Sequence, residues 1–282
     1  MKKGENMKTT KKFLSVILAL SMLLSILSIG AFALDVKNYL VLGDSIGHGS
    51  GLKNPEEASF GKIVADSNGY NYKNDAVPGH TTKNMLQKIG EPEVKTDIEE
   101  ADIISISIGG NNFLHSNIAK LVFRVGVLNK YTEIEKIVEN FKVDFRKIIS
   151  TIKEYNSDVL IVVQTLYNPV PGAIRKTFQN GVDRLNAAYF DCLEENPESY
   201  VIADVAAAFS ADPKLVACDF IHPSAEGNRV IAQVILDTLR NAGLESAQTI
   251  VVIAEGKDKG SKMMRKFFLA ACKFANILWN IK

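Results

Sequence analysis

Short runs of apolar residues alternate with longer stretches of helical periodicity between residues 36 and 242, and this alternation constrains the fold more than any other feature. The four stronger runs are rich in Val, Ile and Leu, which is typical of strands buried on both faces. Strands and helices in alternation predict βαβ units and a parallel sheet covered by helices on both sides. The predicted strands are Tyr39–Gly43, Asp102–Ile108, Val159–Gln164 and Tyr200–Asp204, with a weaker one at Tyr70–Asn74. The predicted helices are Phe60–Asn68, Thr82–Ile89, Tyr131–Tyr155, Ala173–Glu195 and Ser224–Ala242.

Composition agrees with one soluble α/β domain and excludes several other classes of protein. The chain has 282 residues, of which 46% are hydrophobic and 23% charged, close to the averages for globular proteins. These proportions exclude collagen-like and wholly disordered chains. The formal net charge is only +1, so no basic field indicates a nucleic-acid partner.

The N-terminal segment predicts an export signal. Five lysines precede an uncharged run from Phe13 to Ala33, which ends in Ala31-Phe32-Ala33. A positive start, an apolar centre and a small-x-small site are the three parts of a secretory signal peptide, so we expect cleavage after Ala33 and a secreted protein. The apolar run is also long enough to span a bilayer, and an uncleaved membrane anchor is the alternative.

The C-terminal segment differs from the rest of the chain. A strand-like run, Thr249–Ala254, precedes a charged break and then the basic amphipathic stretch Ser261–Lys282. Such a helix either packs on the domain with its lysines in water or contacts an anionic membrane surface.

The three cysteines beyond residue 33 are too few and too widely spaced for a disulfide framework or a CxxC metal site; they are Cys192, Cys218 and Cys272. One Cys192–Cys218 bridge remains an alternative to buried, unpaired cysteines.

A serine follows the first predicted strand directly, in Gly43-Asp44-Ser45. Ligands of open α/β sheets bind at the carboxyl ends of the strands, so Ser45 should project into the functional crevice. Asp and Ser at this position also serve as turn residues or helix N-caps. The tripeptide alone therefore does not establish a nucleophile.

A serine hydroxyl needs a base, and His222 is the best candidate. It lies in Asp219-Phe220-Ile221-His222-Pro223, just before the last predicted helix of the domain. A carboxylate three residues before a histidine can hold the imidazole Nδ1–H and leave Nε2 for the serine. The alternatives are that Asp219 only caps a turn and that His222 is a surface residue. The same pair could also belong to a metal site, but the sequence offers no convincing third ligand.

Two further segments could supply hydrogen-bond donors to a developing oxyanion. The strand Asp102–Ile108 runs into Gly109-Gly110-Asn111-Asn112, which brings an amide side chain to the same edge of the sheet. The segment after the weaker strand contains Gly79 and offers its backbone N–H. Glycine and asparagine also end strands as plain turns, so each segment is weak evidence alone.

Together these four segments resemble the SGNH (GDSL-like) hydrolase family. GDSI at 43–46 is similar to the first family block, with Ile where Leu is often found, and NDAVPGHTT at 74–82 is similar to the second. GGNN at 109–112 is similar to the third block and DFIHP at 219–223 to the last. The blocks occur in family order within residues 38–242.

The resemblance implies an α/β fold, a three-layer α/β/α sandwich of flavodoxin-like type with a central parallel sheet of about five strands. It implies Ser45 as the nucleophile, His222 as the base and Asp219 as its orienting partner. The oxyanion hole would consist of the Ser45 and Gly79 backbone N–H groups and the Asn111 side chain. Neither a cofactor nor a metal is implied. The expected organisation is a signal peptide at 1–33, a hydrolase domain at 34–245 and a C-terminal extension at 246–282.

One departure concerns Asn112, because the third block of this family usually ends in Asn-Asp. We expect altered support of the neighbouring loop rather than loss of activity.

The function that the resemblance implies is a secreted serine esterase acting on carboxylic esters, with a lipid, a small acyl ester or an acylated glycan of xylan or pectin type as substrate. A non-catalytic glycan-binding module on the same fold is the alternative from another class. Contact of 261–282 with a membrane surface would favour lipid.

Overall fold

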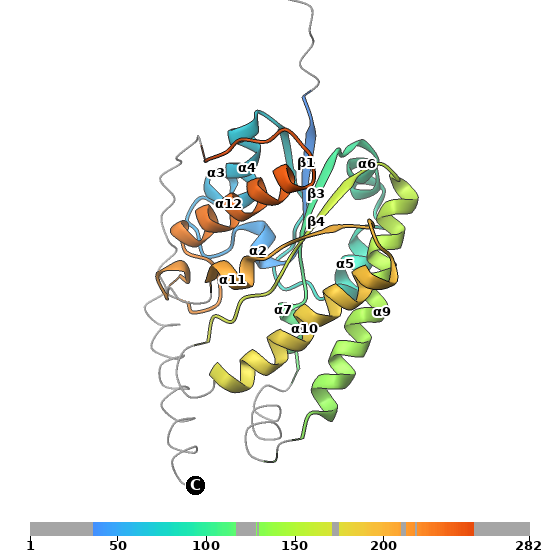
Figure 1. The fold of residues 1–282 in the computed structure, drawn as a ribbon, viewed down its shortest axis with the longest axis vertical. Helices are drawn as coiled ribbons and strands as arrows, with labels where there is room; N and C mark the ends of the chain where they lie inside the picture. Colours follow the sequence, from blue (N-terminus) through green and yellow to red (C-terminus); the bar gives the residue numbers. More distant parts are fainter. Residues whose placement is uncertain are drawn as a thin grey trace, which may run out of the picture. The chain divides into compact units, whose positions relative to one another are not determined.

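The computed structural model describes residues 36–116, 128, 130–170, 175–209, 213–217 and 219–250. Its centre is a sheet of five parallel strands in the order β2-β1-β3-β4-β5 (Figure 1). This order is that of flavodoxin-like doubly wound sheets, whose ligands bind where the strand order reverses. The predicted sheet is thus confirmed. The strands are β1 (Asn38–Gly43), β2 (Asn71–Asn74), β3 (Ile103–Ser107), β4 (Leu160–Gln164) and β5 (Val201–Ala203).

Helices cover both faces of the sheet, so the three-layer prediction is also confirmed (Figure 1). On one face lie α5 (Thr82–Lys88), α6 (Pro92–Glu100), α9 (Thr132–Tyr155) and α10 (Arg175–Glu195). On the other face lie α4 (Phe60–Asn68), α11 (Val205–Phe209) and α12 (Ala225–Asn241). The shorter elements are α2 (Ser45–His48), α3 (Pro55–Ala58), α7 (Gly110–Leu114) and the 3₁₀ turn η1 (Pro213–Leu215).

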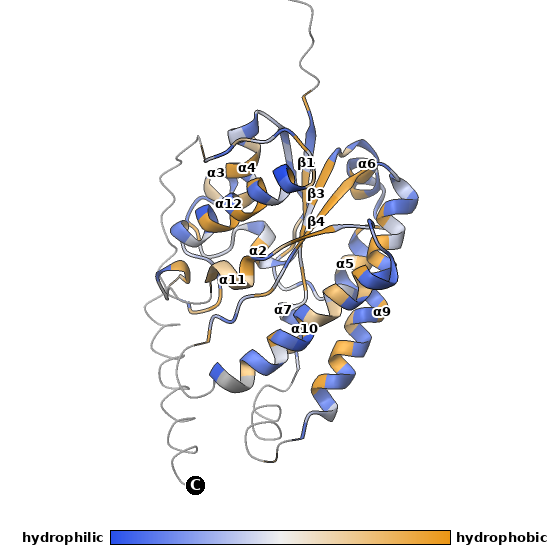
Figure 2. Cartoon of the chain, in the orientation of Figure 1, coloured by the Kyte–Doolittle hydropathy of each residue, from blue (hydrophilic) through white to orange (hydrophobic). Residues whose placement is uncertain are grey.

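Successive side chains of the strands point to opposite faces of the sheet and are buried in two separate hydrophobic cores. Leu40 and Leu42 of β1 point to the α5, α6, α9 and α10 side, whereas Tyr39 and Val41 point to the α4 and α12 side. Figure 2 shows the consequence, with apolar strands between helices whose outward faces are hydrophilic. Burial of both strand faces explains why these runs are almost continuously apolar.

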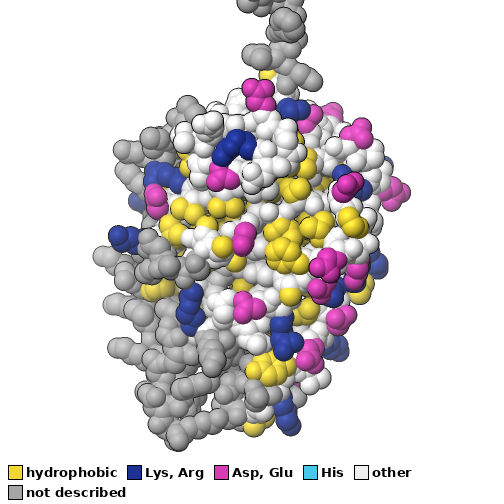
Figure 3. Space-filling view, in the orientation of Figure 1, with side chains coloured by type: hydrophobic (Ala, Val, Ile, Leu, Met, Phe, Trp, Pro, Cys, Tyr) yellow, Lys and Arg dark blue, Asp and Glu magenta, His cyan; other side chains and the backbone are white. Residues whose placement is uncertain are grey.

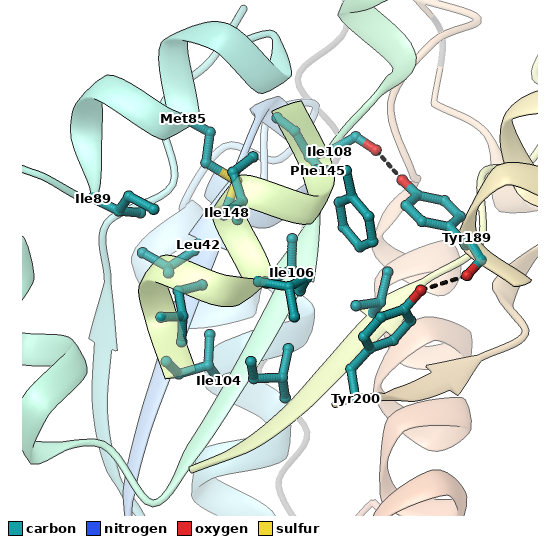
Figure 4. Close-up of a cluster of buried hydrophobic side chains, with 14 of the residues drawn as sticks. Leu42, Met85, Ile89, Ile104, Ile106, Ile108, Phe145, Ile148, Tyr189 and Tyr200 are labelled. Carbon is teal, nitrogen blue, oxygen red and sulfur yellow. Dashed lines mark hydrogen bonds between the residues drawn. The ribbon is translucent and has the colours of Figure 1, made fainter. Parts of the chain in front are cut away.

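Two tyrosines link the larger core to the end of β3. The Tyr189 hydroxyl donates to the carbonyl of Ile108, and the Tyr200 hydroxyl donates to the carbonyl of Tyr189 (Figure 4). Ile108 directly precedes Gly109, and a Cβ added at Gly109 would lie 3.2 Å from the Tyr189 hydroxyl oxygen. The start of the GGNN segment is therefore fixed against the core.

The outer surface of α9 and α10 carries ion pairs that join the two helices. Lys142 pairs with Asp191 at 2.8 Å, and Arg146 contacts Glu195 at 2.5 Å. Figure 3 shows basic and acidic side chains interspersed over the described surface on this side. Within the described ranges, no helix has the length and apolarity needed to cross a membrane.

Several predictions at the ends of the chain are not addressed by this fold. The signal peptide at 1–33, the basic stretch Ser261–Lys282, Cys218 and Cys272 lie outside the described residues. Cys192 is buried and free. Of the strand-like run Thr249–Ala254, only residues 249 and 250 are described, and they are not in a strand. Ile250 instead packs against the α4 and α12 core as a partly buried side chain.

Candidate active site

Ser45 stands at the first position of α2, separated from the Gly43 end of β1 only by the helix cap Asp44, close to where the sequence predicts it. The carboxylate of Asp44 caps this one-turn helix by accepting a hydrogen bond from the Ile46 N–H at 2.9 Å. The tight strand-to-helix turn requires glycine at position 43, which has a φ of +126°. A Cβ there would lie 1.9 Å from the Ser107 carbonyl oxygen. Ser45 is thereby held at the carboxyl edge of the sheet with its side chain partly exposed.

Asp44 is itself buried beside β3. Its backbone N–H donates to the Ser107 carbonyl at 2.9 Å, and its carboxylate accepts from the Ser107 hydroxyl at 3.4 Å. Burial raises the pKa of the Asp44 carboxyl to about 7, although the hydrogen bonds to its carboxylate and the nearby His222 act in the opposite direction. Asp44 therefore serves the serine as a helix cap and brings a titratable group near His222.

Asp219 and His222 form the pair that the sequence predicts. The Asp219 Oδ2 atom lies 2.7 Å from His222 Nδ1, and Asp219 Oδ1 accepts the backbone N–H groups of Ile221 and His222, each at 3.0 Å. Burial raises the pKa of the Asp219 carboxyl, but these hydrogen bonds outweigh it and the net shift is downward. A carboxylate that holds Nδ1–H leaves His222 Nε2 available as a base.

The backbone between these two residues is strained in support of that geometry. Phe220 has a φ of +59°, a left-handed conformation that is uncommon for a residue with a side chain. The loop is closed on both sides, because the Ala217 N–H donates to the His222 carbonyl at 2.8 Å and the Phe220 N–H donates to the Ala217 carbonyl at 3.0 Å. Strain of this kind persists where surrounding bonds over-determine the conformation, and it is frequent at functional sites.

The segment that carries Ser45 lies against His222. The Ser50 N–H donates to the Ser45 carbonyl at 2.9 Å, so residues 45–50 form a compact turn. Gly51 follows with a φ of +101°, and a Cβ on it would lie 2.8 Å from His222 Cβ. Among the described hydrogen bonds, none joins Ser45 Oγ to His222. Catalytic hydrogen bonds are often long without substrate and tighten when it binds.

Gly79 and Asn111 come from different loops and are brought together. Gly79 is the third residue of a turn in which the His80 N–H donates to the Val77 carbonyl at 3.2 Å, and its φ of +85° suits this position. The Asn111 side chain is 7% exposed, and its Nδ2 donates to the His80 carbonyl at 2.9 Å. An amide nitrogen carries two hydrogens, so one N–H of Asn111 is left for another acceptor.

Asn112 supports the same loop by a different route. Its Oδ1 accepts the Thr82 N–H at 3.2 Å, and its Nδ2 donates to the Thr82 hydroxyl at 2.8 Å. The Thr82 hydroxyl in turn donates to Asp144 Oδ2 on α9 at 3.1 Å. Both ends of the side-chain amide are thus engaged, and the altered loop support expected at this position stays a prediction.

Sequence reasoning missed Tyr167, which lies three residues beyond the end of β4. Its hydroxyl donates to the Ile221 carbonyl at 2.6 Å, and its ring stacks on Phe209 with centroids 4.3 Å apart. Burial raises its pKa, and the carboxylates of Asp44 and Asp219 act in the same direction. The one sequence feature that could have indicated a role for Tyr167 is its position just past a predicted strand.

Among the described residues, no group of three or more His, Cys, Asp or Glu side chains could hold a metal.

Comparison with known proteins identifies the family of the chain. The sequence model of the GDSL-like Lipase/Acylhydrolase family matches residues 41–230, from β1 into α12. The chain belongs to this family. The four segments of this GDSL-like chain that resemble family blocks all lie within the matched range.

The GDSL-like chain is also similar to individual proteins. It is 28% identical over 222 residues to the uncharacterized protein YpmR of Bacillus subtilis (strain 168), covering 74% of this chain and 84% of that one. It is 26% identical over 218 residues to the spore germination lipase LipC of Bacillus licheniformis, covering 73% of this chain and 95% of that one. The lipase Lip_vut3 from a goat rumen metagenome has the same fold, with a TM-score of 0.59 at 20% identity over 74% of this chain and 98% of that one.

Proposed function

We propose that this GDSL-like chain hydrolyses carboxylic esters through an acyl-enzyme formed on Ser45. The observation that carries the proposal is the 2.7 Å contact between Asp219 Oδ2 and His222 Nδ1, in a loop packed against the segment that bears Ser45. This is the arrangement that orients an imidazole to activate a serine hydroxyl. Family membership supports ester hydrolysis as the reaction class.

The proposed reaction has two halves. Ser45 Oγ attacks the ester carbonyl carbon while His222 Nε2 takes the hydroxyl proton, which gives a tetrahedral oxyanion. His222 then returns the proton to the departing alcohol, and the acyl group remains on Ser45. Water repeats the sequence with His222 as base, which releases the carboxylic acid and restores the serine. Asp219 stays ionised and stabilises the imidazolium in both halves.

In this proposal three donors hold the oxyanion. They are the backbone N–H groups of Ser45 and Gly79 and the Asn111 Nδ2 amide. The first N–H groups of a helix have no intrahelical acceptor, which frees the Ser45 N–H at the start of α2. Asn111 is placed beside the Gly79 turn by its bond to the His80 carbonyl, which supports a shared role.

The test is covalent labelling with a fluorophosphonate probe, comparing wild type with Ser45→Ala. We expect labelling of the wild type, its loss in Ser45→Ala and its retention in Ser150→Ala, a matched change at an exposed serine on α9. Labelling that persists in Ser45→Ala would contradict the proposed nucleophile. A folded wild-type protein that is not labelled and hydrolyses no ester, yet binds a glycan, would favour the non-catalytic module.

We further propose lipid-type acyl esters as the substrate class, on the similarity to a spore germination lipase. Rates on p-nitrophenyl esters of increasing chain length test this. Preference for eight or more carbons supports the lipid assignment, whereas preference for acetate together with release of acetate from acetylated xylan or pectin contradicts it. Loss of the long-chain preference on deletion of residues 261–282 would assign that segment to lipid contact.

Export is proposed on the signal-like sequence of residues 1–33. N-terminal sequencing of the protein recovered from the culture medium tests it. A mature chain that begins at Leu34 supports cleavage after Ala33, and a chain that retains the apolar run supports a membrane anchor instead.

A further inference from the structure

A continuous chain of hydrogen bonds links the third sequence block to α9 through the start of α5. It consists of Asn112 Nδ2, the Thr82 hydroxyl and the Asp144 carboxylate, with distances of 2.8 and 3.1 Å, and we call it the Asn112–Thr82–Asp144 chain. Thr82 has an exposed fraction of 0%, so no solvent competes for its hydroxyl. The three residues come from three different helices, α7, α5 and α9.

The direction of every bond in this chain is determined by the chemistry of its ends. The backbone N–H of Thr82 can only donate, so the Asn112 atom that accepts it is Oδ1 and the atom facing the Thr82 hydroxyl is Nδ2. The hydroxyl must therefore accept from Asn112. Its single hydrogen is then directed to Asp144, whose carboxylate can only accept.

Two members of the Asn112–Thr82–Asp144 chain lie close in sequence to the loop-borne donors of the proposed oxyanion hole. Asn112 follows Asn111 directly, and Thr82 lies three residues after Gly79. Asn111 ties α7 to the His80 carbonyl, and Asn112 ties α7 to Thr82, so two consecutive side chains fix the Gly79 loop against α7. Asp144 anchors this assembly to α9, where the next residue, Phe145, is fully buried in the core.

We propose that Asp144 is a positioning residue, which through the Thr82 hydroxyl holds Asn112 and thereby sets the relative placement of the Gly79 N–H and the Asn111 amide. This proposal rests on the proposed esterase function. The proposal also gives a reason for an amide at position 112. A carboxylate at position 112 would face the same hydroxyl as Asp144, and one hydrogen cannot serve two carboxylates.

The proposal is tested by exchanging the two side chains. In Asn112→Asp, kcat for p-nitrophenyl acetate should fall roughly 10- to 100-fold with little change in KM, because the donors are displaced while the ester-binding surface is kept. In the double variant Asn112→Asp/Asp144→Asn, the Thr82 hydroxyl can donate to the carboxylate now at position 112 and accept from the amide now at position 144. We expect this exchange to restore most of the lost kcat, with KM again little changed.

Two results would overturn the proposal. One is a wild-type kcat in Asn112→Asp. The other is a fall in kcat in the double variant equal to the product of the falls in Asn112→Asp and in Asp144→Asn. Should Asn112→Asp fail to fold, Thr82→Val with Thr82→Ser as its matched control decides the question. A lower kcat in the Val variant alone supports the proposal, and equal kcat values in both overturn it. The Ser45→Ala labelling result reports independently on the proposed function, so an active, Ser45-dependent enzyme without the exchange effect refutes only the role of Asp144.

Discussion

The hydroxyl of Tyr167 donates a hydrogen bond to the carbonyl of Ile221, 2.6 Å away. Ile221 lies between Phe220, which has a left-handed backbone, and His222, whose ring is held by Asp219. Tyr167 follows β4, so this bond attaches the Asp219–His222 loop to the sheet that also carries Ser45. The loop is therefore held from outside as well as by the bonds of Asp219.

Tyr167→Phe removes that bond and keeps the ring stacked on Phe209. We expect kcat for a p-nitrophenyl ester to fall roughly tenfold, because His222 loses part of its alignment with Ser45. The loss of one hydrogen bond should lower the free energy of unfolding by about 1 kcal/mol, measured by denaturant titration. Tyr155→Phe is the matched control, since the Tyr155 ring contacts Lys95 at the far end of α9. Unchanged kcat in Tyr167→Phe would mean that the bonds of Asp219 suffice.

Asn111→Ala removes a proposed oxyanion donor and the bond to the His80 carbonyl. Because that donor acts on charge developed in the transition state, kcat should fall on the order of 10²–10³-fold while KM changes little. Steady-state kinetics on p-nitrophenyl acetate measure both constants. Asn180→Ala, on α10, controls for loss of an asparagine bond elsewhere, because Asn180 accepts from Arg184. A fall in kcat of less than about tenfold would remove Asn111 from the oxyanion hole.

Much of the fold was predictable because its long elements have strong periodicity. The predicted helix Phe60–Asn68 matches α4 residue for residue, and the buried run in β3 lies within the prediction of Asp102–Ile108. The helix α6 was missed because only Val94 and Ile98 of its nine residues are buried, which leaves a mostly polar pattern. One-turn helices such as α2 are too short to show any periodicity.

The candidate site likewise contains contacts that the sequence predicts and contacts that it does not. The sequence predicts that Asn111 and the Gly79 loop meet, because both follow strands that end at one edge of the sheet, and the bond from Asn111 to His80 agrees. Asp144 gave no such signal, since it lies within an ordinary amphipathic helix and its partner Thr82 is 62 residues away. Contacts of this kind depend on how helices pack, which local sequence patterns do not specify.

The half-buried Asp75, in the segment that leads to Gly79, predicts a pH-dependent stability. Burial and the adjacent Asp97 carboxyl raise the pKa of Asp75 to about 6, while Lys73 and Lys88 act in the opposite direction. The folded protein therefore holds this proton more tightly than the unfolded chain, and the stability it contributes is lost as the pH rises toward and through about 6. Asp75→Asn should raise Tm at about pH 8 and have little effect at about pH 4.

Thermal unfolding at the two pH values measures this difference. Asp158→Asn, at an exposed carboxylate in the loop before β4, is the control for the removal of a carboxylate elsewhere. If Asp75→Asn instead raised Tm equally under the acidic and the alkaline condition, deprotonation of Asp75 would not be the destabilising event.

Gly51 and Gly69 offer a matched pair that tests the contact between the Ser45 segment and His222. Both have positive φ, +101° and +68°, so an alanine at either position costs roughly 1 kcal/mol of backbone strain. Only at Gly51 does the added Cβ meet His222, at 2.8 Å from its Cβ, whereas nothing lies within 4 Å of a Cβ at Gly69. Gly51→Ala should therefore lower kcat by more than about tenfold at temperatures where both variants are folded, and Gly69→Ala should lower only Tm. Equal kcat in the two variants would show that His222 tolerates displacement, and that its alignment does not depend on the Gly51 backbone.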